Sequence, residues 1–197
     1  QKPLRCPTGR PARPRYTQPM DIHGHGTGFT LLEILATLSI AALLLAVGVP
    51  SLQHFTQRQQ MKAAVGSLHN DLLLARSEAI VRNLEVVACP GAPAVGCAGA
   101  SDWSRGWIVF GDGNGDRQRQ ASEALVRHGQ GFERMRIASS SGRSSVRFFP
   151  DGSAPGSNGS IAFCGDGGPL QAWRLVVSNI GRVRAAEYPE IDPAACP

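Results

Sequence analysis

The pattern of apolar and polar positions first marks one long uninterrupted apolar segment. From Phe29 to Val49 there are 21 residues that carry a single charge, Glu33. At about 1.5 Å per residue, a helix of that length would extend about 31 Å, which matches the hydrocarbon core of a bilayer. A secretory signal peptide fits poorly, because its apolar region is shorter and no small-residue cleavage site follows the segment. The pattern therefore predicts one membrane-spanning helix.

After Pro50 the apolar residues recur at alternating spacings of four and three, which is typical of an amphipathic helix. The apolar stripe consists of Met61, Val65, Leu68, Leu72, Ala75 and Ala79. The opposite, polar face consists of Gln59, Lys62, Asn70, Asp71 and Ser77. A coiled coil is the alternative, but the stripe lasts less than three heptads, so packing on a sheet is favoured.

From residue 84 onward, short apolar runs alternate with Gly, Pro, Ser and Asp, a pattern that predicts β-strands joined by turns. We expect strands at 84–88, 107–110, 124–127, 134–138, 145–149, 160–164, 172–178 and 182–186. A long N-terminal helix that packs on a mostly antiparallel β-sheet is an α+β fold.

Composition and charge narrow the function classes. The chain is 42% apolar with a net charge of +5, which excludes a fully disordered protein, and one spanning segment excludes a multi-pass membrane protein. Residues 1–28 hold five basic groups and one acid, so they carry +4 of the +5. Overall basicity is therefore no argument for nucleic-acid binding.

The segment Gly28-Phe-Thr-Leu-Leu-Glu33 resembles the prepilin-peptidase site of type IV pilins and type II secretion pseudopilins. The resemblance implies cleavage between Gly28 and Phe29, N-methylation of Phe29, and Glu33 as the fifth mature residue. Pro50 matches the proline that bends the helix in that family. In a fibre, the Glu33 carboxylate would meet the positive N-terminus of a neighbouring subunit; the alternative is a glutamate that only reaches the lipid headgroups.

The resemblance also implies a domain organisation. Residues 1–28 would be the prepilin leader, 29–49 the transmembrane and assembly helix, 50–83 its amphipathic continuation, and 84–197 a β-rich periplasmic domain. If translation starts at Met20, the leader lacks Lys and Arg, whereas residues 1–19 would supply the positive charge. The expected location is the bacterial inner membrane and then a pilus or pseudopilus, and the expected partners are prepilin peptidase and other pilins.

Within this group, the chain is similar to the GspH/FimT family of minor pilins and pseudopilins over nearly all of residues 28–186. The segments that carry the similarity are Asp102-Trp-Ser-Arg-Gly-Trp-Ile-Val-Phe110, Val146-Arg-Phe-Phe-Pro-Asp-Gly152 and Val177-Ser-Asn-Ile-Gly-Arg-Val-Arg184. The sequence shows no nucleophile–base set, phosphate loop or metal cluster, so we expect neither an enzyme nor a cofactor.

Basic residues are concentrated near the C-terminal end of the predicted sheet. Seven arginines but only two acids, Asp151 and Asp166, lie between residues 134 and 184. The arginines are Arg134, Arg136, Arg143, Arg147, Arg174, Arg182 and Arg184. On a strand, Arg182 and Arg184 would project from one face and could hold adjacent phosphates.

Gly181-Arg-Val-Arg184 is similar to the GRxR motif associated with DNA binding in FimT-type pilins that serve natural transformation. The resemblance makes Gly181, Arg182 and Arg184 a candidate site for double-stranded DNA, and we expect Arg174 and Arg147 to support it. Three alternatives remain open: the arginines pair with acids near the C-terminus, solubilise an edge strand, or form a protein interface. Those acids are Glu187, Glu190 and Asp192.

Five cysteines occur at positions 6, 89, 97, 164 and 196, and removal of residues 1–28 would leave four in an oxidising periplasm. Of the three possible pairings, we favour Cys89–Cys97, which closes a Pro/Gly-rich loop, together with Cys164–Cys196. The closely spaced cysteine pairs of a zinc site are absent from the sequence.

A calcium-loop pattern occurs at Asp112-x-Asn114-x-Asp116, with Glu123 in the twelfth place. Arg117 occupies the sixth place, where the sharp turn of such a loop calls for Gly, and the segment lies between two predicted strands. We therefore interpret it as a polar hairpin loop without a metal.

Two functions follow from these observations. One is a minor type IV pilin that primes or joins the pilus and binds extracellular DNA non-specifically for uptake in natural transformation. The alternative is a structural pseudopilin of type II secretion, or a pilus-priming minor pilin, that does not bind DNA.

Overall fold

The computed structural model describes residues 28–165 and 172–188 and divides the chain into two compact units, 1–45 and 46–197. A single long helix, α1 (Leu31–Arg82), passes from the first unit into the second, with Pro50 inside it. The part of α1 near the N-terminus contains a stretch that is long and apolar enough to cross a membrane, and its side chains are exposed.

The second unit contains two antiparallel sheets. The five-stranded sheet consists of β1 (Glu85–Ala92), β2 (Gly96–Cys97), β3 (Gly106–Asp112), β4 (Leu125–Gln130) and β6 (Val146–Phe148). The four-stranded sheet consists of β5 (Met135–Ser139), β7 (Gly159–Gly165), β8 (Ala172–Val177) and β9 (Val183–Tyr188), in the order β5-β7-β8-β9. Strand β9 is therefore an edge strand.

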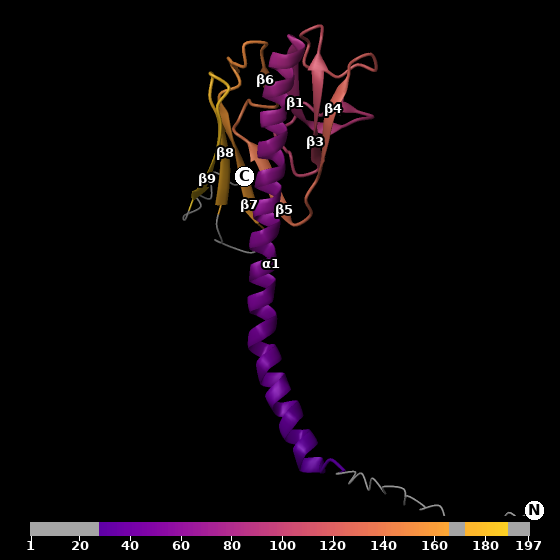
Figure 1. The fold of residues 1–197 in the computed structure, drawn as a ribbon, viewed down its shortest axis with the longest axis vertical. Helices are drawn as coiled ribbons and strands as arrows, with labels where there is room; N and C mark the ends of the chain where they lie inside the picture. The colour runs from indigo at the N-terminus through magenta and orange to yellow at the C-terminus, as the bar shows by residue number, and fades with distance from the viewer. Residues whose placement is uncertain (1–27, 166–171, 189–197) are drawn as a thin grey trace, which may run out of the picture. The chain divides into compact units, whose positions relative to one another are not determined.

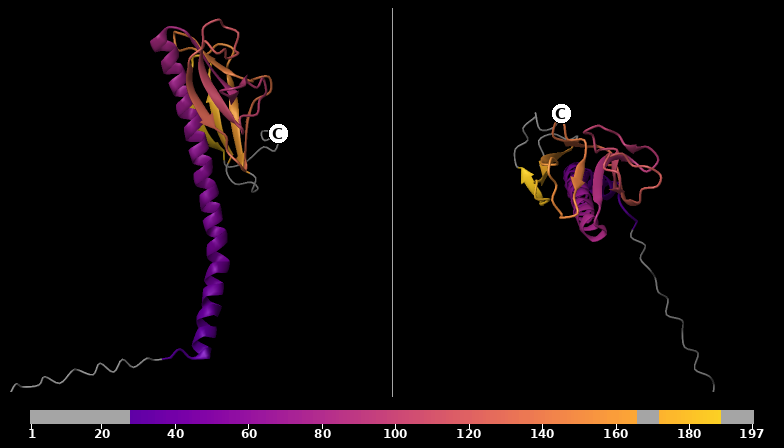
Figure 2. Two further views of the ribbon diagram at one scale, coloured as in Figure 1. Left: turned by 90° about the vertical axis from the view of Figure 1, so that its right-hand side faces the viewer. Right: turned by 90° about the horizontal axis from the view of Figure 1, so that it is seen from above.

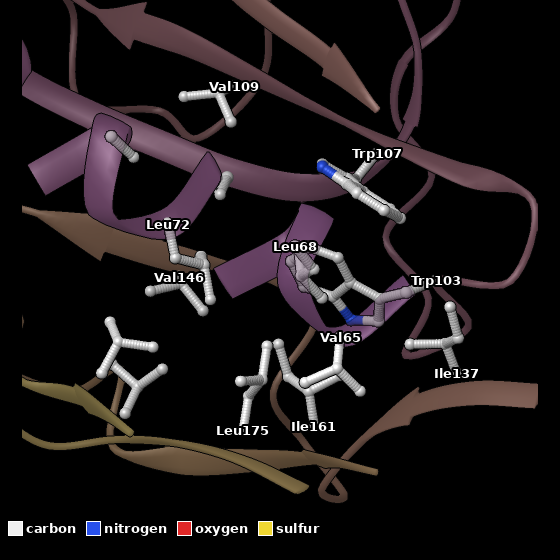
Figure 3. Packing of buried hydrophobic residues seen from close by; sticks show 14 of the residues in the cluster. Val65, Leu68, Leu72, Trp103, Trp107, Val109, Ile137, Val146, Ile161 and Leu175 are labelled. Carbon is white, nitrogen blue, oxygen red and sulfur yellow. The ribbon is translucent and has the colours of Figure 1, made fainter. Parts of the chain in front are cut away.

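The part of α1 that belongs to the second unit packs against both sheets, which lie together on one side of the helix (Figures 1 and 2). All six residues of the predicted apolar stripe are buried. Figure 3 shows Val65, Leu68 and Leu72 among side chains from both sheets, including Val146 and Leu175. Because each fully buried Leu contributes about 1.5–3 kcal/mol, this stripe is a major attachment of the helix to the sheets.

The structure corrects one assignment on this helix. Asp71, which the periodicity places on the polar face, is only 4% exposed. Its carboxylate accepts a hydrogen bond from Trp107 Nε1 at 2.8 Å and one from Arg127 Nε at 3.2 Å. Both partners belong to the five-stranded sheet, on β3 and β4, so the buried face of the helix extends on that side to include Asp71.

The predicted α+β fold is confirmed, and each of the eight expected strands is present with boundaries shifted by a few residues. The two-residue strand β2 was not expected. It pairs with the end of β1 through Gly91 opposite Cys97 and Ala92 opposite Gly96, which is too short a run to produce a visible alternation in the sequence.

Candidate nucleic-acid interface

The candidate arginines lie on and beside the hairpin that joins β8 to β9. Val177 is opposite Val183, and the turn is closed by hydrogen bonds from Ser178 N to Arg182 O (3.0 Å) and from Gly181 N to Ser178 O (2.8 Å). Gly181 has φ +75°, the left-handed conformation that a three-residue hairpin loop requires at this position. The glycine at position 181 therefore determines the geometry of the turn and the point at which the edge strand begins.

Gly181 also packs closely against a second turn. A Cβ atom at this position would lie 1.9 Å from the carbonyl oxygen of Gly152, and Arg76 Nε donates a hydrogen bond to the same oxygen at 2.9 Å. Ala154 N donates to Asn179 O at 2.8 Å. The structure therefore explains the glycine by the packing of the hairpin against residues 150–154.

The strand register assigns Arg184 to the face of the four-stranded sheet that points away from α1, which we call the outer face. Arg182, immediately before β9, is exposed and takes the alternate position on the same side. Val183 and Leu175 are buried in the core cluster that includes α1, so the residues that alternate with them point outward. Arg184 lies opposite Val176, and Arg174 lies opposite Ala186, on the same outer face. Three of the five predicted residues are therefore on this face.

The arginines are spaced regularly along this face. Arg182 and Arg184, both exposed, are two positions apart in the chain, which on a strand is a rise of about 6.6 Å. Arg174 is a diagonal neighbour of Arg184 across the β8–β9 pair, at about 7–8 Å. Arg174 is half-buried and makes an interaction of its own.

No acid within the described residues forms an ion pair with Arg182 or Arg184. Glu187 lies opposite Trp173, which packs on the core cluster, so the register places Glu187 on the other face from Arg184. The acids Glu190 and Asp192 lie outside the described residues. At the β9 edge, the described part of the face therefore carries uncompensated positive charge.

Arg147 is in a different place from the other candidates. It belongs to β6 in the five-stranded sheet, where its Nη1 donates to Glu85 Oε2 at 3.1 Å. Its guanidinium also lies 4.5 Å from the centre of the Phe149 ring. These contacts give Arg147 a role in joining β6 to β1, and the sequence could not reveal that it would belong to the other sheet.

The positive charge is weaker on the β5 side of the outer face. Arg136 is exposed there, but an acid lies nearby. Asp102 forms an isolated antiparallel β-bridge with Ala138, which is two positions after Arg136 in β5. Hydrogen bonds from Ser104 lower the pKa of the Asp102 carboxyl, and the positive charges of Arg105 and Arg136 lower it further. Asp102 therefore remains ionised at neutral pH and partly balances Arg136.

The remaining motif of interest, the calcium-like pattern, lies in the loop between β3 and β4, as expected. The carboxylate of Asp112 accepts hydrogen bonds from Gly115 N at 2.8 Å and Arg117 N at 3.0 Å. That of Glu123 accepts from Gly113 N at 3.0 Å and Gln120 N at 2.9 Å. These acids hold the loop backbone, and the described residues contain no cluster of three metal-binding side chains.

The Cys89–Cys97 disulfide is confirmed and joins β1 to β2, with 5.6 Å between the Cα atoms. Cys164, on the outer face of β7, is also disulfide-bonded. Its expected partner, Cys196, lies outside the described residues, so that pairing stays a prediction.

At the other end of the chain, the structure describes the predicted cleavage residues but not the leader. Gly28 and Phe29 are exposed and precede the helix, and Glu33 lies in its first turn. Thr30, to which the sequence analysis assigned no role, caps the helix: its hydroxyl oxygen accepts a hydrogen bond from Glu33 N at 3.2 Å. Met20 and the rest of residues 1–27 lie outside the described residues.

The family described as Type II transport protein GspH matches residues 64–181, which is more than half of the chain. The chain belongs to the GspH family. Its members are pilin-like structural proteins, so this chain is a minor pilin or pseudopilin of a type IV pilus or type II secretion system and not an enzyme.

Solved structures share the fold. Two crystal structures of the type IV minor pilin FimU from Pseudomonas aeruginosa match with TM-scores of 0.50 and 0.53 at 22% and 23% identity. These matches cover 64% and 67% of this chain and 91% and 92% of FimU. The minor pseudopilin EpsH of the Vibrio cholerae type II secretion system matches with a TM-score of 0.47 at 14% identity, covering 64% of this chain and 96% of EpsH. A search of curated protein sequences found no match.

Proposed function

We propose that this GspH-family subunit joins a type IV pilus as a minor pilin and binds double-stranded DNA there, during natural transformation, through the β9 edge of its outer face. The observation that carries the proposal is that Arg184 in β9 and Arg182 immediately before it are both exposed and alternate with the buried Val183. No acid among the described residues pairs with either of them. Arg174 extends the positive face onto β8.

Assembly is proposed to follow the pilin pattern. Prepilin peptidase would cut between Gly28 and Phe29 and leave an N-methylated Phe29, with the subunit anchored in the inner membrane by the apolar part of α1. On assembly with other pilins, Glu33 would pair with the N-terminal amine of a neighbour. The pair would be desolvated between packed helices, where opposite charges attract more strongly than in water.

The proposed binding mode is recognition of the phosphate backbone. Two arginines whose backbone positions are about 6.6 Å apart on one face can each hold a phosphate of one strand, and neither reads a base. Such binding weakens with added salt, because each neutralised phosphate releases bound counterions. Unrelated DNA sequences should therefore bind with similar affinity.

The test is a fluorescence-anisotropy titration of the full chain in detergent micelles with two unrelated 30-base-pair duplexes. We expect Arg182→Gln/Arg184→Gln to weaken binding to both duplexes at least about tenfold at low salt. The slope of log K against log salt should fall in magnitude by about 2.

The matched control is Arg134→Gln/Arg136→Gln, which removes the same charge from two arginines at the β5 side of the sheet, Arg136 on β5 and Arg134 immediately before it. We expect the control to change the affinity less than threefold. Equal losses in the two double variants would show that net charge and not the β9 edge governs binding, and an unchanged affinity in the first would exclude the proposed site.

One observation favours the structural alternative, a GspH-like subunit without DNA binding. Ile180, at the tip of the β8–β9 hairpin, is 71% exposed, and an apolar tip suits contact with another protein subunit. In that case the wild-type chain would show no DNA binding at low salt, whereas Ile180→Asp would reduce its co-purification with other minor pilins.

A further inference from the structure

The segment of α1 between its apolar run and the core of the second unit is exposed on all sides. The apolar run ends at Val49, and the first residue of α1 in the core cluster is Met61. Every residue from 50 to 60 is exposed, and we call this segment the stem. At 1.5 Å per residue the stem is about 16 Å long, so neither the core nor a hydrocarbon layer that ends at Val49 would cover it.

One side of the helix changes from apolar to basic along the stem. Leu52, Phe55, Arg58 and Lys62 follow spacings of three, three and four, which place them along one side of a helix. Leu52 is 63% exposed and Phe55 57%, and both basic residues are exposed. Two large apolar side chains in consecutive turns, both exposed, indicate that something outside the described fold covers this side.

The positive charge on this side has no counter-charge along the helix. The sequence holds no Asp or Glu between Glu33 and Asp71, and Arg58 and Lys62 are the only Lys or Arg residues in that interval. In the part of the chain that the structure describes, neither of them forms an ion pair. The partner that covers this side is therefore expected to be anionic.

The order of these side chains matches the layers at a membrane surface. Each headgroup layer is about 5–8 Å thick, and Leu and Phe side chains of amphipathic helices are buried where it meets the acyl chains. Phe55 and Arg58 lie about 9 Å and 13.5 Å along the helix axis from Val49. Because helical side chains lean toward the N-terminus, here toward the apolar run, the Arg58 guanidinium extends back toward the headgroups. The attraction of an anionic surface extends about 8–10 Å further into solution, far enough to include Lys62.

We propose that Arg58 and Lys62 bind the headgroups of anionic phospholipids, while Leu52 and Phe55 are buried at the boundary between headgroups and acyl chains. The proposal rests on the proposed membrane anchoring of the subunit and not on DNA binding. Zwitterionic headgroups carry a cation of their own, so they attract the two basic side chains less. Because the apolar and the basic pair occupy neighbouring layers, the contact limits how far α1 slides along its axis before assembly.

The test reconstitutes the membrane-extracted subunit in phosphatidylcholine vesicles that contain a trace of spin-labelled phosphatidylglycerol or spin-labelled phosphatidylcholine. Electron spin resonance measures the fraction of each labelled lipid that the protein immobilises. We expect the wild type to select phosphatidylglycerol at low salt, and Arg58→Gln/Lys62→Gln to lower that selectivity at least about threefold. Residues 1–28 are the same in every variant, so charges there do not affect the comparison.

The matched control is Arg182→Gln/Arg184→Gln, which removes the same charge far from the stem. The hairpin that carries these arginines packs on Arg76, about 27 Å along α1 from Arg58. We expect the control to change the lipid selectivity less than about 1.5-fold. Equal losses in the two double variants, or no loss in the stem variant, would overturn the proposal. A wild type that immobilises neither lipid would reject the membrane anchoring itself, and the proposal with it.

A charge-preserving variant and a fibre assay separate lipid from protein as the partner of the stem. Arg58→Lys/Lys62→Arg keeps both charges and should keep the wild-type selectivity to within about 1.5-fold. If the stem instead pairs with acids of a neighbouring pilin, Arg58→Gln/Lys62→Gln would keep the wild-type lipid selectivity and be depleted from sheared fibres. That result would overturn the proposal and leave the anchoring intact.

Discussion

At the scale of single residues, the most informative position is Asp71, because its burial contradicts the helix pattern. The spacing of apolar residues locates the centre of the buried face but not its width, and the width depends on which strands pack against the helix. Trp107 and Arg127, which come from different strands 36 and 56 residues later in the chain, supply the hydrogen bonds that make this burial possible. Partners so distant in sequence leave no local signal.

Replacement of Asp71 tests this account. Asp71→Ala would leave Trp107 Nε1 buried without an acceptor, so we expect the free energy of unfolding to fall by about 1–3 kcal/mol. Chemical denaturation monitored by tryptophan fluorescence measures the change. Asn70→Ala, on the exposed neighbouring position, serves as control and should change stability by less than about 0.5 kcal/mol. Equal stability of the two variants would contradict a structural role for Asp71.

Gly181 offers a second test at this scale, with a close match elsewhere in the chain. Gly181 and Gly156 have φ of +75° and +73°, but a Cβ at Gly156 would meet no atom within 4 Å, whereas one at Gly181 would meet Gly152 O at 1.9 Å. Gly156→Ala should therefore cost only the left-handed strain of about 1–2 kcal/mol. Gly181→Ala should cost clearly more in thermal unfolding; the same loss in both would show that the turn can move away.

At the scale of elements, the sequence predicts the helix and eight strands well, because their alternation and their Gly- and Pro-rich boundaries are local properties. It also predicts that Arg182 and Arg184 share a face. It does not predict which strands share a sheet, so Arg147 was grouped with arginines that the fold places in the other sheet. Strand pairing is a long-range property, and no single segment encodes it.

The disulfide between β1 and β2 can be tested as an element-scale contribution. Closing a loop with a sequence separation of 8 is expected to stabilise the fold by about 2.5 kcal/mol through the entropy of the unfolded chain. Cys89→Ala/Cys97→Ala should lower the unfolding free energy by about that amount, measured in denaturant without reductant. In the presence of reductant, the difference from the wild type should shrink; a constant difference would indicate that lost packing at buried Cys89 and not the bond is responsible.

At the scale of the whole molecule, the two units differ in whether their apolar side chains are buried. Every residue of the two described core clusters lies in the second unit, while the exposed apolar stretch of α1 begins in the first. The second unit thus has the core of an independent domain, and the first depends on lipid or on neighbouring helices to cover its apolar surface. Glu33 is the only charge between residues 29 and 49.

Glu33→Gln tests whether that charge serves assembly. The variant should still enter the membrane, because the change removes a charge from the spanning segment. In a fibre it would leave the neighbour's amine buried without a counter-charge, a cost of about 3–5 kcal/mol. Immunoblots should therefore find it in the membrane fraction but depleted from sheared fibres, while Ser39→Ala in the same helix is present in both. Normal incorporation of Glu33→Gln would reject the pairing.

The contact of Gly181 with Gly152, which Arg76 of α1 joins by a hydrogen bond, has a mechanical consequence. It connects the β8–β9 hairpin to α1 directly, without passing through the strands of the sheet. Tension that enters at the hairpin would pass through this contact into the helix, so that the hairpin keeps its geometry under load.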